Sequence, residues 1–257
     1  MNQGPWSSSK LCHGSRVTLD QIAPAFALCI ILVMVGSDLG TSSIFACILA
    51  GLLWVSGLRL GVFGITLSVG LVGLTAAILT SPYRVQRFMV FLNPFAEDQY
   101  KFYGWQPAHS LLGLASGGFF GVGLGASRQK WGNLAEAHTD FIFAVIGEEL
   151  GLFGTIATLL LLSILLFSIF KLALRAQDPM VRYVASGFGC WLAIQSILNV
   201  GSAISVLPVV GVTLPLVSYG GSALIATYMG IGFVLGAARR DPVIYKELKE
   251  TGIPWLR

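Results

Sequence analysis

The chain has 257 residues and a formal net charge of +4, with 55% hydrophobic and only 11% charged residues. Soluble globular proteins carry roughly 25% charged residues, and the mean hydropathy of this chain is +0.78. The composition therefore excludes a disordered chain, a disulfide scaffold and an ordinary cytosolic enzyme, and it predicts a protein that lies in a lipid bilayer. Nucleic acid is not expected as a partner, because the sequence has no basic stripe with interleaved aromatic residues.

Uncharged segments divide the chain into expected membrane spans, each of which needs about 20 apolar residues. Four single runs fit this length, at residues 21–37, 39–58, 60–83 and 150–170. Residues 183–238 contain no Asp, Glu, Lys or Arg, and this run is far too long for one crossing. Pro and Gly residues between Leu207 and Gly221 interrupt it, so it should hold two helices. We therefore predict an all-α, polytopic membrane protein with about six transmembrane helices.

The distribution of Lys and Arg predicts the orientation of these helices. If residues 1–20 are a cytoplasmic N-terminal segment, eleven of the sixteen Lys and Arg residues fall on the cytoplasmic side and five on the outer side. This bias is the one that the positive-inside rule expects. The membrane domain then covers residues 21–238, and residues 239–257 form a cytoplasmic tail.

A long extracytoplasmic loop is expected at residues 81–139, and loops of this size are usually functional. Its apolar patches at residues 88–92 and 111–115 predict short helices on the membrane surface. Arg84 and Arg87 are three residues apart and would share a helix face. They are suited to pyrophosphate oxygens, and anionic lipid headgroups are an equal alternative.

Acidic residues cluster where this loop enters the fourth predicted span. Glu136, His138 and Asp140 place two carboxylates and an imidazole within five residues, and a carboxylate there could act as a general base toward a substrate hydroxyl. The spacing alone favours the simpler interpretation that Thr139 or Asp140 caps the next helix. Asp38 lies between the first two spans and faces the same side by topology, and a helix cap would explain it as well.

Further polar residues lie within the predicted spans. Glu148 and Glu149 are ionisable groups at membrane depth, which indicates either function or favourable placement near a helix N-terminus. Gln195 and Asn199 are four residues apart on one helix face, and Ser218 follows in the interrupted segment. They could form helix–helix hydrogen bonds or line a polar cavity. No HxxxH, CxxC, P-loop or GxSxG motif occurs, so no metal or nucleotide motif is predicted.

Together these stretches resemble the SEDS family of bacterial cell-wall polymerases. The matching stretches are Asp38-Leu39-Gly40-Thr41, Tyr83-Arg84, residues 91–94, 116–118 and 121–125, Gln129-Lys130, residues 136–150, Gln195 with residues 199–201, and residues 207–222. They cover nearly all of the chain from Asp38 to Asp241, and they follow the order of the family. The form of residues 127–131 resembles the division-type members more than the elongation-type members.

The resemblance implies a ten-helix fold, of which the six helices here would be the C-terminal part. It also implies a peptidoglycan glycosyltransferase that polymerises lipid II at the outer face of the bacterial cytoplasmic membrane. Asp140 matches the proposed catalytic residue of the family, which acts as general base on the acceptor 4-hydroxyl while C1 of the donor is inverted and undecaprenyl pyrophosphate leaves. Candidate substrate-binding residues are Arg84, Arg87, Lys130, Glu136, His138, Asp38, Gln195, Asn199 and Ser218. The roles of Arg84, Arg87 and Lys130 toward the pyrophosphate are hypotheses from their charge.

The expected partners also follow from the resemblance. They are a class B penicillin-binding transpeptidase and other division proteins, at the division septum. No cofactor is firmly implied, and Mg²⁺ or Mn²⁺ is the candidate cation. Two alternatives stay open: a lipid II flippase, which is a transporter, and a non-catalytic component of the division machinery. Asp140→Asn separates the first of these from the enzyme, because polymerisation should collapse while flipping should survive.

Overall fold

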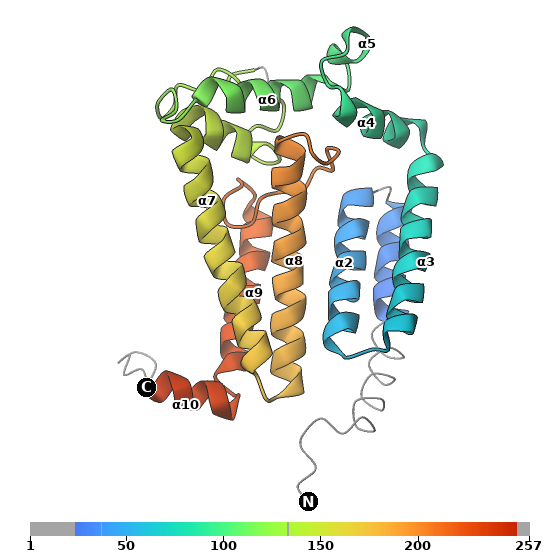
Figure 1. Ribbon diagram of the computed structural model, residues 1–257, viewed down its shortest axis with the longest axis vertical. Helices are drawn as coiled ribbons and strands as arrows, with labels where there is room; N and C mark the ends of the chain where they lie inside the picture. The colour runs from blue at the N-terminus through green and yellow to red at the C-terminus, as the bar shows by residue number, and fades with distance from the viewer. Residues whose placement is uncertain (1–23, 37, 133, 251–257) are drawn as a thin grey trace, which may run out of the picture. The chain divides into compact units, whose positions relative to one another are not determined.

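The computed structural model describes residues 24–36, 38–132 and 134–250. Within these residues every regular element is a helix (Figure 1), so the predicted all-α class is confirmed. Apolar helices come first, at Pro24–Val35 and, as α2, at Leu39–Val55. The later helices are α3 (Leu60–Leu79), α4 (Pro82–Leu92), α5 (Glu97–Tyr100), α6 (Trp105–Gly117), α7 (Ile142–Arg175), α8 (Pro179–Ala203), α9 (Gly221–Ala238) and α10 (Pro242–Glu250).

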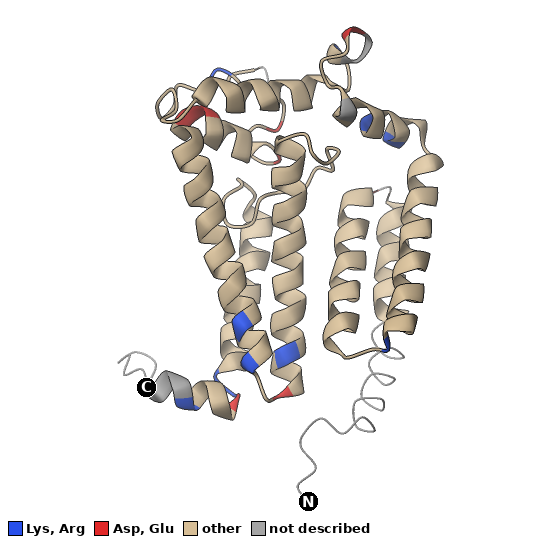
Figure 2. Cartoon of the chain, viewed as in Figure 1, with Lys and Arg blue, Asp and Glu red and all other residues tan. Residues whose placement is uncertain are grey.

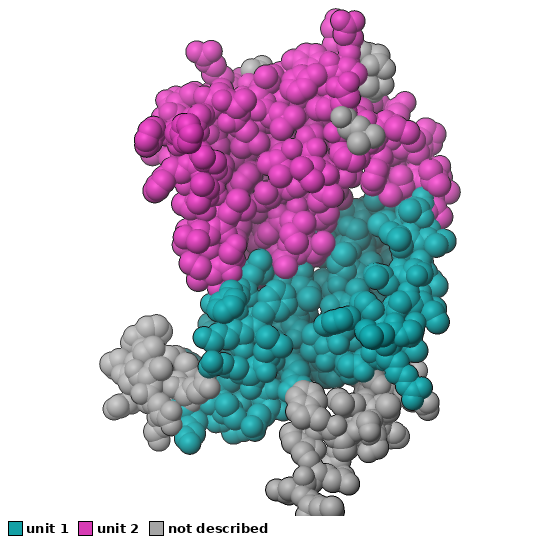
Figure 3. Space-filling model, viewed as in Figure 1, with its two compact units in different colours: residues 1–75, 166–191, 229–257 teal, residues 76–165, 192–228 magenta. Residues whose placement is uncertain are grey.

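The chain folds into two compact units, each built from segments that are distant in the sequence (Figure 3). The first unit contains residues 1–75, 166–191 and 229–257, and the second contains residues 76–165 and 192–228. The predicted outer loop at residues 81–139 therefore lies wholly within the second unit.

The apolar helices correspond to the six predicted spans. Four of them, α3, α7, α8 and α9, are long and apolar enough to cross a membrane. The helix Pro24–Val35 and α2 are apolar but shorter than 18 residues, and at 1.5 Å per residue they are shorter than a hydrocarbon core of about 30 Å. The predicted interruption of the long apolar run is confirmed, because residues 204–220 between α8 and α9 are not helical.

The boundaries of α7 differ from the predicted span at residues 150–170. The helix begins eight residues earlier, at Ile142, and continues past Lys171 to Arg175 in its last turn. The prediction places the limits of the span at charged residues, but Lys and Arg are favourable near a helix C-terminus and can extend their charged ends toward water. A charge near the end of an apolar run therefore does not end the helix.

The short helices of the outer loop lie in the second unit, where α4 and α6 include the predicted patches at residues 88–92 and 111–115. Both helices extend beyond these patches. Figure 1 shows α6 lying across the ends of α7 and α8. The Ser110 hydroxyl of α6 donates to the backbone oxygen of Ala203 at the end of α8 (2.7 Å). Gly117 of α6 lies so close to the backbone of Gly147 in α7 that a side chain would not fit.

Asp241 joins segments of the first unit. Its fully buried carboxylate accepts hydrogen bonds from four backbone N–H groups, those of Gln177, Asp178, Val243 and Ile244, at 2.6–3.2 Å. Burial by itself raises the pKa of Asp241, but the four donors outweigh that effect and hold the pKa below its usual value.

Basic residues gather at the same end of α7, α8 and α9 in the first unit (Figure 2). The segments that meet there carry Lys171, Arg175, Arg182, Arg239 and Arg240. This grouping is the one that the predicted orientation requires on the cytoplasmic side.

Candidate active site

The Asp140 carboxylate lies just before α7, in a tight turn of the second unit. The backbone oxygen of Glu136 accepts hydrogen bonds from the N–H groups of Thr139, Asp140 and Phe141 at 3.1–3.2 Å. Phe141 is 1% exposed and anchors the turn in the core. The backbone of Asp140 is thereby fixed, whereas its side chain is only half-buried.

The helix-cap interpretation applies to Asp38 but not to Asp140. Asp38 precedes α2, and its carboxylate accepts from Thr41 N (2.9 Å) and from the Thr41 hydroxyl (2.6 Å). No hydrogen bond between described residues joins the Asp140 carboxylate to the first turn of α7. Asp38 thus has a structural task as an N-cap, while the Asp140 carboxylate has none of this kind. Asp38 belongs to the first unit and Asp140 to the second.

Polar side chains predicted near the site hold the backbone around Asp140. The Asn199 amide of α8 is buried and donates to the backbone oxygens of Asp140 (2.8 Å) and Val212 (2.6 Å). The Ser218 hydroxyl donates to the backbone oxygen of Thr139 (2.6 Å). One turn earlier on α8, the Gln195 amide donates to the Thr213 hydroxyl (3.1 Å). These hydrogen bonds run to non-helical segments rather than between helices, and they leave the buried amide oxygens of Gln195 and Asn199 without a partner among the described residues.

Burial and two charged neighbours set the acidity of Asp140. Burial raises the pKa of its carboxyl group, and the negative charge of Glu136 raises it further. The positive charge of Arg87 acts in the opposite direction but does not cancel the rise. A carboxylate with a raised pKa is a stronger proton acceptor, which suits a general base.

Glu136 and His138 lie on the exposed side of the turn. Glu136 has a positive φ of 56°, and its carboxylate accepts from the Thr139 hydroxyl (2.7 Å). The His138 ring meets Tyr219 edge to face, with 5.7 Å between ring centroids, and the backbone oxygen of His138 accepts from Tyr219 N (2.9 Å). Glu136 thus acts on Asp140 through its charge, whereas the contacts of His138 are with Tyr219. The substrate-binding roles of Glu136 and His138 stay predictions.

The predicted cations do not form one cluster. The positive charge of Arg87, on α4, lowers the pKa of Asp140. Its guanidinium donates to the backbone oxygen of Val209 (3.3 Å). Arg84 donates instead to the backbone oxygen of Ala77 at the end of α3 (2.8 Å). The Lys130 ammonium lies 3.6 Å from Glu149, on α7. Only Arg87 is therefore placed beside Asp140 by these contacts.

Glu148 anchors the loop that carries Lys130. Its side chain is 2% exposed and accepts from the Ser127 hydroxyl (2.5 Å) and from the N–H groups of Arg128 (2.9 Å) and Gln129 (3.3 Å). These contacts give Glu148 a positioning role that neither sequence-based interpretation of the acidic pair included, with its partners about 20 residues earlier in the chain.

A break in α7 accommodates the glycine-rich loop at residues 118–123. Gly151 has a positive φ of 68° inside the helix. The loop donates to the backbone oxygens of Glu148 and Glu149, and it accepts from the N–H groups of Leu152 and Phe153, at 2.9–3.3 Å. Irregular backbone within a membrane protein must be paired in this way, so the loop and the break stabilise each other.

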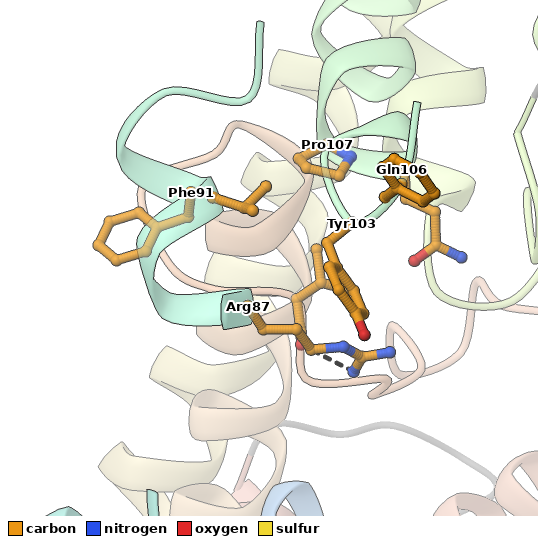
Figure 4. Close-up of a pocket in the computed structure, with 8 residues that line it drawn as sticks. Arg87, Phe91, Tyr103, Gln106 and Pro107 are labelled. Atoms are coloured by element: carbon orange, nitrogen blue, oxygen red, sulfur yellow. Dashed lines mark hydrogen bonds between the residues drawn. The ribbon is translucent and has the colours of Figure 1, made fainter. Parts of the chain in front are cut away.

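A small pocket adjoins the site, and it was not predicted from the sequence. Its lining comes from α4, from the segment before and at the start of α6, and from the segment after α8 (Figure 4). The lining residues are Arg87, Val90, Phe91, Phe102, Tyr103, Gln106, Pro107 and Val209. No local motif marks them, because segments more than 100 residues apart meet here.

The fold and the site define a polytopic membrane protein with a half-buried carboxylate just before a broken helix. Residues 8–242 match the model of the cell cycle protein family named for FtsW, RodA and SpoVE. The chain belongs to this family, which is the SEDS family that the sequence resembled. The match begins before Asp38, the first residue on which the resemblance rested.

Individual relatives agree with this membership. The chain is similar to a probable peptidoglycan glycosyltransferase FtsW of Taylorella equigenitalis, with 36% identity over 95% of this chain and 67% of the relative. The FtsW of Tolumonas auensis, named in the same way, is 42% identical over 83% of this chain and 56% of the relative. A chain from a solved peptidoglycan synthase complex, described as coordinating polymerization and crosslinking, superposes with a TM-score of 0.67. It is 29% identical, over 86% of this chain and 62% of that chain. This chain thus spans between about half and two thirds of the length of these proteins.

Proposed function

We propose that this chain is a peptidoglycan glycosyltransferase, which polymerises lipid II at the outer face of the cytoplasmic membrane during cell division. The names of its relatives support this class of reaction. The observation that carries the proposal is the state of Asp140: its backbone oxygen is held by Asn199, while its carboxylate is half-buried with a raised pKa. A half-buried carboxylate with a raised pKa, carried on a backbone that hydrogen bonds hold in place, suits a general base.

The reaction can be written around Asp140. Its carboxylate takes the proton of the 4-hydroxyl of the acceptor sugar as that oxygen attacks C1 of a donor sugar linked to undecaprenyl pyrophosphate. The new C1–O bond forms, the bond from C1 to the phosphate oxygen breaks, and undecaprenyl pyrophosphate leaves with the bonding electrons. Attack from the face opposite the leaving group inverts C1. General-base catalysis typically contributes 10²–10⁴-fold to such a step.

The charged residues divide between the two sides of this reaction. The leaving pyrophosphate departs on the side of C1 away from the base, where the roles of Arg84 and Lys130 stay predictions. Arg87 acts on Asp140 itself, so its position supports a place beside the acceptor rather than the leaving group. Asn199 and Ser218 act as positioning residues, because their partners are the backbone oxygens of Asp140 and Thr139.

The side chains that could ligate a divalent cation are few among the described residues. Among the described residues, no group of three or more His, Cys, Asp or Glu side chains could hold a metal ion. At the candidate site, Glu136 is the carboxylate whose charge acts on Asp140, and Asp140 is assigned the proton. A role for Mg²⁺ or Mn²⁺ stays a prediction, because Mg²⁺ is commonly held by one or two carboxylates together with substrate phosphates, and no step of the proposed reaction is assigned to a cation. Polymerisation rates with Mg²⁺, with Mn²⁺ and with EDTA test whether a cation takes part.

Partners and location extend the proposal. A class B penicillin-binding transpeptidase would cross-link the strands that this chain makes, together with other division proteins at the septum. The structurally similar complex, which is described as coordinating polymerization and crosslinking, supports such a partnership.

The test is polymerisation of labelled lipid II by the purified chain in nanodiscs, with Asp140→Asn beside it. Asp178→Asn is the matched control, because Asp178 accepts from Met180 N near the start of α8 (2.9 Å) and Asn serves equally well in a cap. We expect glycan strands from the wild type and the control, and a loss of 10²-fold or more in Asp140→Asn. Full activity of Asp140→Asn, or lipid II flipping without polymerisation in the wild type, would overturn the proposal.

A further inference from the structure

The pocket beside Asp140 has the size of a single substituent. Its volume is about 100 Å³, whereas sites for whole ligands typically measure about 300–1,000 Å³. The pocket cannot enclose a complete sugar of a lipid-linked disaccharide. It can take one small group that projects from a sugar held at the site.

The lining is mostly apolar, and its polar groups come from Arg87, Tyr103 and Gln106. Val90 is 2% exposed and Pro107 is buried, and Phe91 and Val209 add further apolar surface. Gln106 contributes an amide, which can donate and accept at the same time. A group that fits both parts has a methyl end and a neutral polar end.

The positive charge of Arg87 does not require an anionic ligand in the pocket to balance it. Its guanidinium donates to the backbone oxygen of Val209 and lies 4.6 Å from the centre of the Tyr83 ring (Figure 4 shows the bond to Val209). It also lies in the field of the Asp140 carboxylate. Each of these neighbours is negative or electron-rich, so the positive charge is already compensated. A phosphate would add negative charge next to a carboxylate and apolar walls, which is unfavourable.

From these observations we infer that the pocket binds the acetamido group of the acceptor amino sugar. The methyl group would meet Val90 and Val209, and the amide would exchange hydrogen bonds with Gln106. The acetamido group and the 4-hydroxyl belong to the same ring, at carbons separated by one ring carbon. Because Arg87 links the pocket to Asp140, filling the pocket would place this hydroxyl near the base. The inference rests on the proposed function for the identity of the sugar, and it makes Gln106 and Val209 specificity-determining residues.

The test uses lipid-linked disaccharides whose acceptor sugar carries either an N-acetyl or an N-butanoyl group. Their dissociation constants are measured with the whole chain in nanodiscs, in the Asp140→Asn background so that binding is read without turnover. The chain is compared with Val209→Ala, which enlarges the pocket. Val206→Ala is the matched control, because Val206 lies in the same segment, is 62% exposed and does not line the pocket.

We expect the chain to bind the N-acetyl analogue at least tenfold more tightly, since the N-butanoyl group is two methylenes longer and even one methylene in an apolar pocket changes selection about 10–200-fold. Val209→Ala should reduce or reverse this preference, and Val206→Ala should keep it. Gln106→Leu should weaken N-acetyl binding by about two- to tenfold, as expected for one neutral hydrogen bond.

Equal binding of the two analogues, binding of neither, or the same preference in Val209→Ala would overturn the inference. A failure of the proposed function looks different. A chain that shows the expected binding preference but makes no strands when Asp140 is intact refutes the glycosyltransferase, whereas strand formation without the preference refutes only the pocket.

Discussion

Replacing Glu148 by Gln tests the buried contact on which the loop before Asp140 depends. In the wild type, Oε1 of Glu148 accepts from Arg128 N, and Oε2 accepts from the Ser127 hydroxyl and Gln129 N. The amide of Gln has nearly the same size, but one of its two ends donates rather than accepts. In either orientation at least one backbone N–H loses its acceptor and meets another donor.

The magnitude follows from these contacts. A hydrogen bond to a charged group contributes about 1.5–3 kcal/mol, and a buried donor left unsatisfied costs about 1–3 kcal/mol. Because the Ser127 hydroxyl can rotate to accept from the new amide, we expect a net loss of about 2–4 kcal/mol in the free energy of unfolding. The neighbouring Glu149→Gln is the control. Glu149 lies 3.6 Å from the Lys130 ammonium, with the Lys130 side chain 41% and the Glu149 side chain 11% exposed. No hydrogen bond between described residues ends on the Glu149 carboxylate, so Glu149→Gln should lower the free energy of unfolding less than Glu148→Gln does.

The assay is denaturation of the purified chain in mixed micelles, followed by tryptophan fluorescence. Hydrogen exchange adds a local measurement, and residues 127–130 should exchange faster in Glu148→Gln than in the control. Equal stability of the two variants, or unchanged exchange at residues 127–130 in Glu148→Gln, would show that Glu148 does not hold this loop.

Two further predictions concern stability in the same assay. Asp241→Asn should lower stability near neutral pH, because one of the two acceptor oxygens is lost and with it two of four backbone partners. The pKa of Asp241 is lowered in the folded state. Its contribution to the free energy of unfolding is therefore present above the ordinary Asp value of about 3.9 and is lost as the pH falls through the lowered value. A stability difference between wild type and Asp241→Asn that stays the same in acid would contradict this. Gly151→Ala should cost at least about 1–3 kcal/mol, because φ is 68° and ψ is −160° there and the loop backbone leaves no room. Gly64→Ala, where an added Cβ meets nothing within 4 Å, should cost nothing, and equal effects of the two Gly variants would refute the break in α7.

Much of the fold could be predicted from the sequence, because bilayer spans depend on composition over about 20 residues. The uncharged runs located the apolar helices, and Pro208 and Pro215 lie in the observed interruption between α8 and α9. The break at Gly151 could not be predicted. Its cause is the pairing of α7 with the loop at residues 118–123, and such a contact has no local signature in the sequence.

The candidate site was predictable to a lesser degree. The spacing of Gln195 and Asn199 indicated a polar helix face, but the partner of Asn199 is the backbone of Asp140, 59 residues away. The cap at Asp38 follows from local sequence and was one of the predicted alternatives. The pocket was missed, because contacts such as that between Arg87 and Val209 join residues separated by 122 positions. Single-sequence patterns describe neighbours along the chain, whereas the site is assembled across it.

The claim that the Asp140 carboxylate accepts the proton is tested most directly by the pH dependence of kcat/KM for lipid II polymerisation. The base must be deprotonated, so the rate should rise with pH through its raised pKa. Glu136→Gln removes a charge that raises this pKa and should move the acid limb to lower pH, while Arg87→Gln removes one that lowers it and should move the limb to higher pH. Opposite shifts, with none in Asp178→Asn, are the result we predict. An acid limb that stays in place in both variants, or moves the same way in both, would contradict the assignment of Asp140 as the base.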